Sequence, residues 1–67
     1  MKIILNGKVE NFEDISTVED LINTLKKDLP KFFAVEYNKQ IIYKEDYSSC
    51  KIQENDEIEI VVFAGGG

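Results

Sequence analysis

The chain contains no histidine and only one cysteine among its 67 residues. The absence of histidine removes the most common general base and the most common zinc ligand. Cys50 alone can form neither an internal disulfide nor a site built from several cysteines. We interpret Cys50 as a small, partly buried residue, with a reactive thiol as the alternative. The composition therefore argues against a hydrolase or a metal enzyme, and it predicts no metal ligands.

Phosphate-binding glycine loops and long hydrophobic runs are also missing. Gly7 stands alone, and the other three glycines occupy positions 65–67. No apolar run approaches the roughly 20 residues that cross a bilayer. The opening run ends at Asn6, which makes it shorter than the apolar region of a signal peptide, about 7–15 residues. We therefore expect a cytoplasmic protein with no membrane partner.

The formal net charge is −5, from 13 acidic and 8 basic residues. This balance opposes binding to phosphate backbones, so we expect no nucleic-acid partner. Acidic surface suits docking onto a basic protein, although it also serves solubility. Glu57 and Glu59 could act as a pair of catalytic carboxylates. Their alternation with Ile58 and Ile60 instead indicates the solvent-facing side of a strand.

The chain predicts one small α+β domain over residues 1–63, followed by a flexible glycine tail at 64–67. The expected strands cover residues 2–6, 8–13, 33–37, 40–43 and 57–63. Asn6-Gly7 and Asn38-Lys39 are the expected tight turns, and residues 53–56 are a further turn. Residues 44–51 read as a loop or a single helical turn.

A helix is expected between a cap at Ser16 or Thr17 and a stop at Pro30. The acidic residue three positions after the cap completes a capping box. One apolar stripe follows helical spacing, and its members are Val18, Leu21, Ile22, Leu25 and Leu29. This stripe predicts that one face of the helix packs on the sheet.

The order of these elements is that of the β-grasp, or ubiquitin-like, fold. That fold is a mixed sheet of four to five strands with one main helix on one face. Its first and last strands lie parallel in the centre, and the last strand directs the chain outward. Alternation then places Ile58, Ile60 and Val62 in the core. Val61 and Phe63 face the other way as an apolar docking patch, unless the strand is covered on both faces.

The terminal residues Gly65, Gly66 and Gly67 contribute nothing to packing, because glycine has no side chain. They could be a frayed terminus or an engineered linker. Alternatively, three extended residues reach roughly 10 Å and can thread a narrow channel, which would place the Gly67 carboxylate in a partner's active site. Joined to AMP, that carboxylate gains a leaving group that a persulfide sulfur can displace.

The sequence resembles the ThiS family of sulfur carriers in thiamine biosynthesis, a β-grasp family related in fold to ubiquitin. The resemblance covers essentially the whole chain and is carried mainly by residues 37–42 with Tyr47, by residues 55–61 and by residues 63–67. The family often has proline, arginine and tryptophan where this chain has Tyr43, Lys44 and Tyr47. These departures concern partner contacts, whereas the three terminal glycines match.

The resemblance implies a cycle in which this chain is a co-substrate and not an enzyme. An ATP-dependent activating enzyme, similar to the ubiquitin activators, would adenylate Gly67. A cysteine-desulfurase persulfide would convert the adenylate to a thiocarboxylate, and thiazole synthase would take the sulfur for the thiazole ring of thiamine. The chain itself would bind no cofactor, since the partner uses the ATP. We expect Val61, Phe63, Glu57 and Glu59 to contact the partners.

Two alternatives share the fold. The first is the small subunit of molybdopterin synthase, a sulfur carrier with the same thiocarboxylate chemistry. The second is a ubiquitin-like module for interaction or conjugation, in which Gly67 would be joined to lysines of other proteins. The biosynthetic complex that co-purifies with the chain would separate the first alternative from a thiazole carrier, and an isopeptide bond would identify the second.

Overall fold

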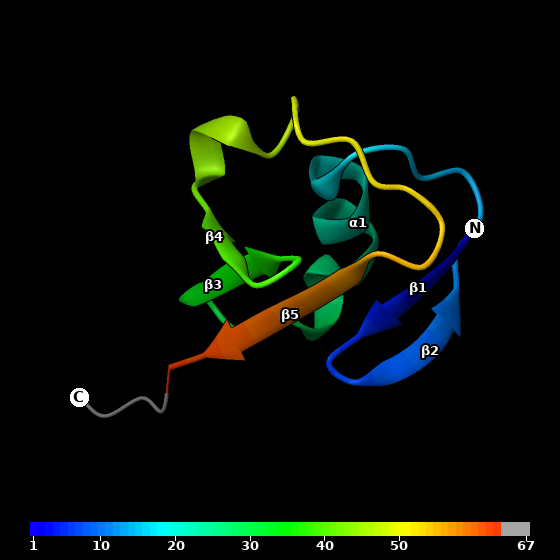
Figure 1. Cartoon of the computed structure of the whole chain (residues 1–67). Coiled ribbons are helices and arrows are strands. Elements are labelled where there is room, and N and C mark those ends of the chain that lie inside the picture. Colours follow the sequence, from blue (N-terminus) through cyan, green and yellow to red (C-terminus); the bar gives the residue numbers. More distant parts are fainter. Residues whose placement is uncertain (64–67) are drawn as a thin grey trace.

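A five-stranded mixed sheet carries one helix on one face in the computed structural model, which describes residues 1–63 (Figure 1). The elements in chain order are β1 Lys2–Leu5, β2 Lys8–Asn11, α1 Val18–Leu25, the 3₁₀ turn η1 Lys26–Asp28, β3 Phe33–Tyr37, β4 Gln40–Ile42, the 3₁₀ turn η2 Lys44–Asp46 and β5 Glu57–Val62. Residues 64–67, predicted as a glycine tail, lie outside the described residues.

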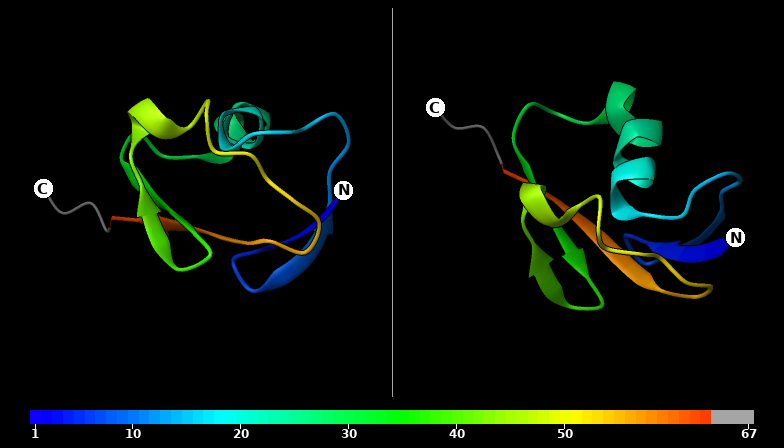
Figure 2. Two further views of the ribbon diagram at one scale, coloured as in Figure 1. Left: turned by 45° about the horizontal axis from the view of Figure 1, so that its top comes forward. Right: turned by 90° about the horizontal axis from the view of Figure 1, so that it is seen from above.

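The strand order is β2-β1-β5-β3-β4, with β5 in the middle of the sheet. β1 and β5 run parallel, and Leu5 lies beside Ile58 in their register. The other pairs are antiparallel. Figure 2 shows α1 on one side of the sheet, with the opposite side left open. The predicted mixed sheet with parallel first and last strands is confirmed.

Both hairpin turns use backbone conformations with positive φ. Asn6 and Gly7 have φ values of 51° and 82°, and Asn38 and Lys39 have values of 49° and 72°. Two consecutive residues with positive φ match the right-handed twist of the strands on either side of a tight hairpin. The turns predicted at these four residues are therefore confirmed.

The two turn asparagines also bind the central strand through their side chains. Asn6 Oδ1 accepts a 2.8 Å hydrogen bond from the N–H of Ile60, and Asn38 Oδ1 accepts a 2.9 Å bond from the N–H of Glu57. β1 ends at Leu5, so the Asn6 side chain supplies a partner to β5 beyond the last residue of β1. These bonds fix the position of the strand that leads to the C-terminal residues.

The helix begins at Thr17, one of the two predicted caps. Thr17 Oγ1 accepts from the N–H of Asp20 at 3.1 Å, and the Asp20 carboxylate accepts from the N–H groups of Ser16 and Thr17. The bond from the Ser16 N–H has the largest effect on the pKa of Asp20. Together these bonds hold that pKa below its usual value. α1 ends earlier than predicted, at Leu25, and the chain tightens into η1 before Pro30.

The core lies between α1 and the sheet. Its buried side chains are Ile3, Leu5, Ile15, Val18, Leu21, Val35, Ile52, Ile58 and Ile60. They come from β1, β3, β5, α1 and the two long connections, which accounts for the apolar spacing of the sequence. Within residues 1–63, no helix is long and apolar enough to cross a membrane.

The prediction that Val62 belongs to the core is wrong, because its side chain is 55% exposed. Alternation places it on the same face as Ile58 and Ile60, which are buried. β1 ends opposite Ile58 and so does not extend beside Val62, which within residues 1–63 pairs only with Phe33 of β3. The core therefore ends at Ile60, and the last residue of β5 is exposed.

A hydrogen-bonded cluster fixes the start of β5. The Tyr37 hydroxyl donates to the Asp56 carboxylate and lies 3.0 Å from the carbonyl oxygen of Lys51. Burial alone would raise the pKa of Asp56, but hydrogen bonds from Tyr37, the Gln53 N–H and Asn38 hold that pKa below its usual value. The bond to Asp56, with burial, raises the pKa of Tyr37 from 10.0 to about 12.

This shift predicts a loss of stability in alkali. A folded-state pKa above the unfolded value means that the Tyr37 bond contributes fully below pH 10 and is lost as the pH rises to about 12. We expect Tyr37→Phe to lower the free energy of unfolding by roughly 1–2 kcal/mol below pH 10. Above pH 10, the free energy of unfolding of this variant should decline less than that of the wild type. Chemical denaturation across this pH range measures both effects.

Tyr43→Phe is the matched control, because Tyr43 is 65% exposed. This substitution also removes a tyrosine hydroxyl, but from the surface. The stability of the variant should therefore depend on pH as that of the wild type does. If the stabilities of Tyr37→Phe and the wild type fell in parallel above pH 10, the Tyr37–Asp56 bond would not be the cause of the alkaline loss of stability.

Candidate functional site

The last strand brings three of the four predicted docking residues to the open face of the sheet. Glu57, Glu59 and Val61 alternate with the buried Ile58 and Ile60 and so lie on the face away from α1. Glu57 and Glu59 are exposed and Val61 is half-buried. The interpretation of both glutamates as the solvent-facing side of a strand is confirmed.

Phe63, the fourth predicted docking residue, is the last described residue and is 58% exposed. It follows β5 directly and lines a groove on the side of β3 and β4. An exposed phenyl ring beside the C-terminal residues provides the apolar contact area that is typical of interface centres. Gly65, Gly66 and Gly67 lie outside the described residues, so their predicted roles stay predictions.

The sheet register adds three residues to this face. Glu36 pairs with Glu59, Ala34 pairs with Val61, and Ile41 pairs with Glu36 from the neighbouring strand. The sequence alone does not reveal them, because alternation within β3 and β4 indicates two faces and only the register shows which face adjoins Glu59. The open face thus combines an acidic centre with apolar residues along β3, β4 and the end of β5.

Three carboxylates gather in the acidic centre. Glu36, Glu57 and Glu59 line a hollow of about 130 Å³, with Lys39 at its border. Like charges directly opposite one another on adjacent strands destabilise a sheet, so Glu36 and Glu59 oppose folding slightly. A basic partner surface would relieve this repulsion. The arrangement therefore favours a docking partner with lysine or arginine at its contact surface.

The described part of the chain offers little support for a metal site or a reactive thiol. Within residues 1–63, no group of three or more cysteine, aspartate or glutamate side chains could hold a metal ion. Cys50 is half-buried, and burial, followed by the charges of Asp56 and Asp46, raises the pKa of its thiol. A protonated thiol is a poor nucleophile. This supports the interpretation of Cys50 as a packing residue.

Sequence comparison relates the chain to named proteins along its whole length. The sequence model of the ThiS family matches residues 3–67. The sulfur carrier protein ThiS of Bacillus subtilis is 44% identical over 64 residues, which are 94% of this chain and 96% of that protein. Two proteins named thiazole synthase, from Paramagnetospirillum magneticum and Magnetococcus marinus, are 42% and 43% identical over 67 residues. This chain spans 20% of the length of each thiazole synthase.

Solved structures agree with the fold. The crystal structure of the thiamine biosynthesis protein ThiS from Geobacter metallireducens matches with a TM-score of 0.81 and 26% identity, over 100% of both chains. An NMR solution structure of a thiamine biosynthesis protein from the same organism matches with a TM-score of 0.77 and 25% identity, over 100% of this chain and 88% of that one. The predicted β-grasp fold is confirmed.

Proposed function

The chain belongs to the ThiS family, and on this basis we propose that it is a sulfur carrier for thiazole formation in thiamine biosynthesis, with the sulfur held as a thiocarboxylate at Gly67. The observation that carries the proposal is the 44% identity to the Bacillus subtilis sulfur carrier over nearly the full length of both chains. The two relatives named thiazole synthase favour the thiazole pathway over molybdopterin synthesis.

The proposed chemistry needs a free carboxylate from this chain and catalytic groups from its partners. An activating enzyme joins a Gly67 carboxylate oxygen to the AMP of ATP and releases pyrophosphate. A persulfide sulfur then attacks the carbonyl carbon, and AMP leaves with the electron pair of the broken C–O bond. A second thiol reduces the resulting acyl disulfide, which leaves a thiocarboxylate on Gly67 and a disulfide on the donor. The carrier is thus a co-substrate.

The proposed partners are an adenylating enzyme, a sulfur donor derived from a cysteine desulfurase, and thiazole synthase, all in the cytoplasm. ATP is consumed by the adenylating enzyme, and the carrier binds no cofactor of its own. Gly65 and Gly66 give Gly67 its reach into each active site, since residues without Cβ need the narrowest channel. The open face docks the activating enzyme through Glu57, Glu59 and their neighbours.

Mass spectrometry of the intact chain tests the proposal. Incubation with ATP, a cognate activating enzyme and a sulfur donor should add the mass difference between sulfur and oxygen, located at Gly67. An unchanged mass under these conditions would overturn it. Attachment of Gly67 to lysines of other proteins would identify a conjugation module instead.

Charge reversal on the open face should weaken docking of the activating enzyme. We expect Glu57→Lys with Glu59→Lys to raise the Kd by roughly tenfold or more, because a basic partner would then face two like charges. Glu10→Lys with Glu13→Lys changes the net charge equally at exposed positions outside this face, and should have little effect. Titration calorimetry measures both. Equal affinities for the two double variants would count against the acidic centre as a contact.

Substitution of Cys50 should leave sulfur transfer intact. Because burial raises the pKa of this thiol, we expect Cys50→Ala to form the thiocarboxylate at the wild-type rate. The cost in stability should be modest, since the residue is only half-buried. A rate that falls more than about tenfold in a folded Cys50→Ala protein would show that the thiol takes part in the transfer.

A further inference from the structure

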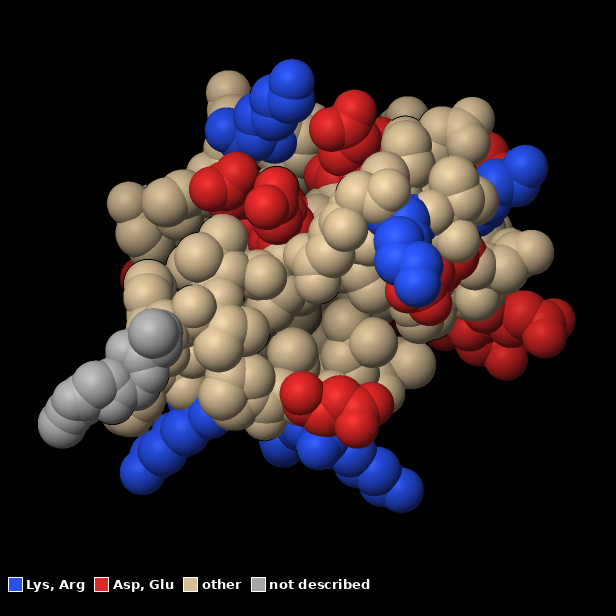
Figure 3. All heavy atoms as spheres, turned by 90° about the horizontal axis from the view of Figure 1, so that it is seen from below, with Lys and Arg blue, Asp and Glu red and all other residues tan. Residues whose placement is uncertain are grey.

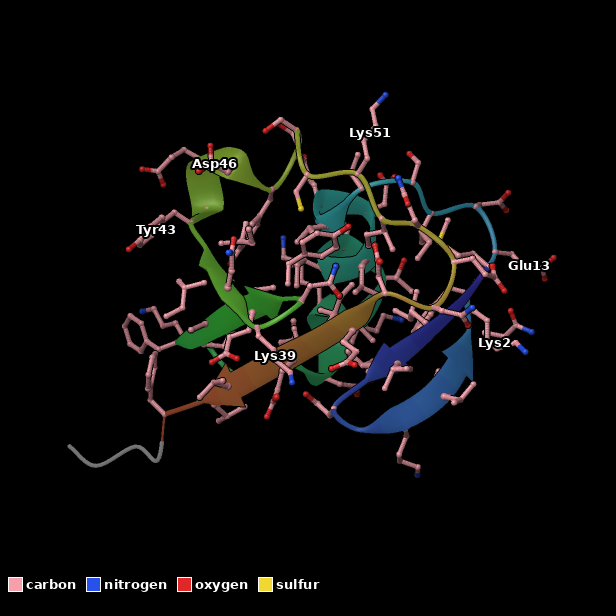
Figure 4. The ribbon with its side chains drawn as sticks, in the orientation of Figure 1. Lys2, Glu13, Lys39, Tyr43, Asp46 and Lys51 are labelled. Atoms are coloured by element: carbon pink, nitrogen blue, oxygen red, sulfur yellow. The ribbon has the colours of Figure 1, made fainter. Side chains whose placement is uncertain are left out.

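A second surface lies on the other side of the β3–β4 hairpin from the acidic centre. It is a groove of about 890 Å³ bordered by α1, the segment after η1, β4 and η2. The half-buried apolar residues that line it include Ile22, Leu29, Phe33, Ile42 and Tyr47, while Ala34 and Ile41 border both this groove and the open face. Tyr43 and Phe63 are exposed at its edge, and Figure 4 shows Tyr43 projecting outward beyond β4.

The charge of this groove is opposite to that of the chain as a whole. Among residues 1–63, Lys26, Lys31 and Lys44 line it together with a single acidic residue, Glu19. The chain as a whole carries −5. Figure 3 shows lysine and acidic side chains interspersed around the margin of the molecule seen from below, with uncharged surface between them. The molecule therefore presents two surfaces of opposite sign.

Both surfaces lie close to Phe63, the last described residue. Phe63 lines the groove, and the open face of β5 ends two residues before it, at Val61. A protein that fills the groove would therefore lie beside the point where residues 64–67 begin, without covering Glu57 or Glu59. Two different proteins could contact the carrier at this end at the same time.

The proposed chemistry requires such a three-protein contact. An acyl-adenylate is made in the active site of the activating enzyme, and a persulfide must reach its carbonyl carbon before water does. A persulfide on a protein cannot diffuse free of that protein. The donor must therefore approach the carrier while the activating enzyme is still docked, which calls for a second contact surface beside Phe63.

We propose that the lysine-bordered groove docks the persulfide-bearing donor protein while the activating enzyme occupies the open face. The charge of the groove requires acidic residues on the donor, and its apolar floor requires aliphatic or aromatic anchors between them. An amphipathic acidic segment has this chemistry. The inference rests on the proposed function, since it assigns a surface to one of its partners.

The test compares two sulfur donors on one carrier variant, Lys31→Glu with Lys44→Glu. With a cysteine-desulfurase persulfide below saturation, we expect thiocarboxylate formation to slow by about tenfold, because two groove charges are reversed. With sodium sulfide, whose hydrosulfide ion displaces AMP directly and needs no docking, the rate should equal that of the wild type. ATP–pyrophosphate exchange with the activating enzyme should also be unchanged.

Two further variants sharpen the comparison. Lys8→Glu with Lys27→Glu makes the same charge change at exposed positions that do not line the groove, and should react like the wild type with both donors. Tyr43→Ser removes an exposed ring from the groove edge and should slow the persulfide reaction alone. Thermal unfolding checks that each variant is folded.

Several results would overturn the inference. One is an unchanged persulfide rate in the Lys31/Lys44 variant, and another is an equal loss with sulfide, which would place the groove in contact with the activating enzyme. Self-association that depends on these lysines, measured by sedimentation, would assign the groove to a second copy of the chain. A wild-type carrier that is not adenylated at all would refute the proposed function itself.

Discussion

Removal of Gly67 alone should slow thiocarboxylate formation by at least about 100-fold. The deletion withdraws the carboxylate by one residue, about 3.3–3.6 Å, and a displacement of about 1 Å already costs reacting groups roughly 10²-fold in rate. Intact-mass measurement of thiocarboxylate with time gives the rate for each variant. All nine buried core residues precede position 61, so thermal unfolding should report an unchanged fold.

Gly67→Ala is the matched control for this deletion. It keeps the chain length and the terminal carboxylate but adds a Cβ, so it separates the reach of the tail from the width of the channel. We expect a smaller loss than for the deletion. A deletion variant that reacts at the wild-type rate would refute the assignment of Gly67 as the site of attachment.

Ile58→Ala should remove a large part of the free energy of unfolding. Its side chain is 1% exposed in the middle of the central strand, and Ile→Ala at a buried site costs about 2–5 kcal/mol. A domain of this length has a total stability of only about 3–10 kcal/mol. We expect the urea midpoint, followed by circular dichroism, to fall to about half of the wild-type value or lower.

Ile41→Ala makes the same substitution in the edge strand β4, where the side chain is 56% exposed. Its cost should stay within about 0.5 kcal/mol. Similar losses at the two isoleucines would mean that the core does not depend on β5 as the structure indicates.

The sequence predicted those features that depend on residues close together in the chain. The helix start at Thr17, the turns at Asn6 and Asn38, and the alternation around Ile58 all follow from local backbone preference and side-chain period. The prediction for Val62 was wrong because the burial of this residue depends on a strand that is distant in the chain. Where the core ends depends on where β1 stops beside β5, and alternation within one strand carries no information about its neighbour.

The candidate site was only partly predictable for the same reason. Glu57, Glu59 and Val61 follow from one strand, but Glu36 joins them through the register of β3 against β5. The lysine-bordered groove is lined by α1, by η2 and by the segment that follows η1. These elements are separated in the chain, so no local sequence pattern predicts the groove. The side-chain bonds of Asn6 and Asn38 to β5 were also missed, because asparagine in a turn is explained by the turn alone.

The central place of β5 also determines when the chain can fold during synthesis. β5 is the last of the described strands to be synthesised, yet it lies between β1 and β3 and supplies two of the core residues. A nascent or truncated chain that lacks it has neither a continuous sheet nor a closed core, and contacts between distant parts of a chain form late. Only a chain translated through residue 62 can therefore present the two proposed docking surfaces, so incomplete chains would not compete for the proposed partners.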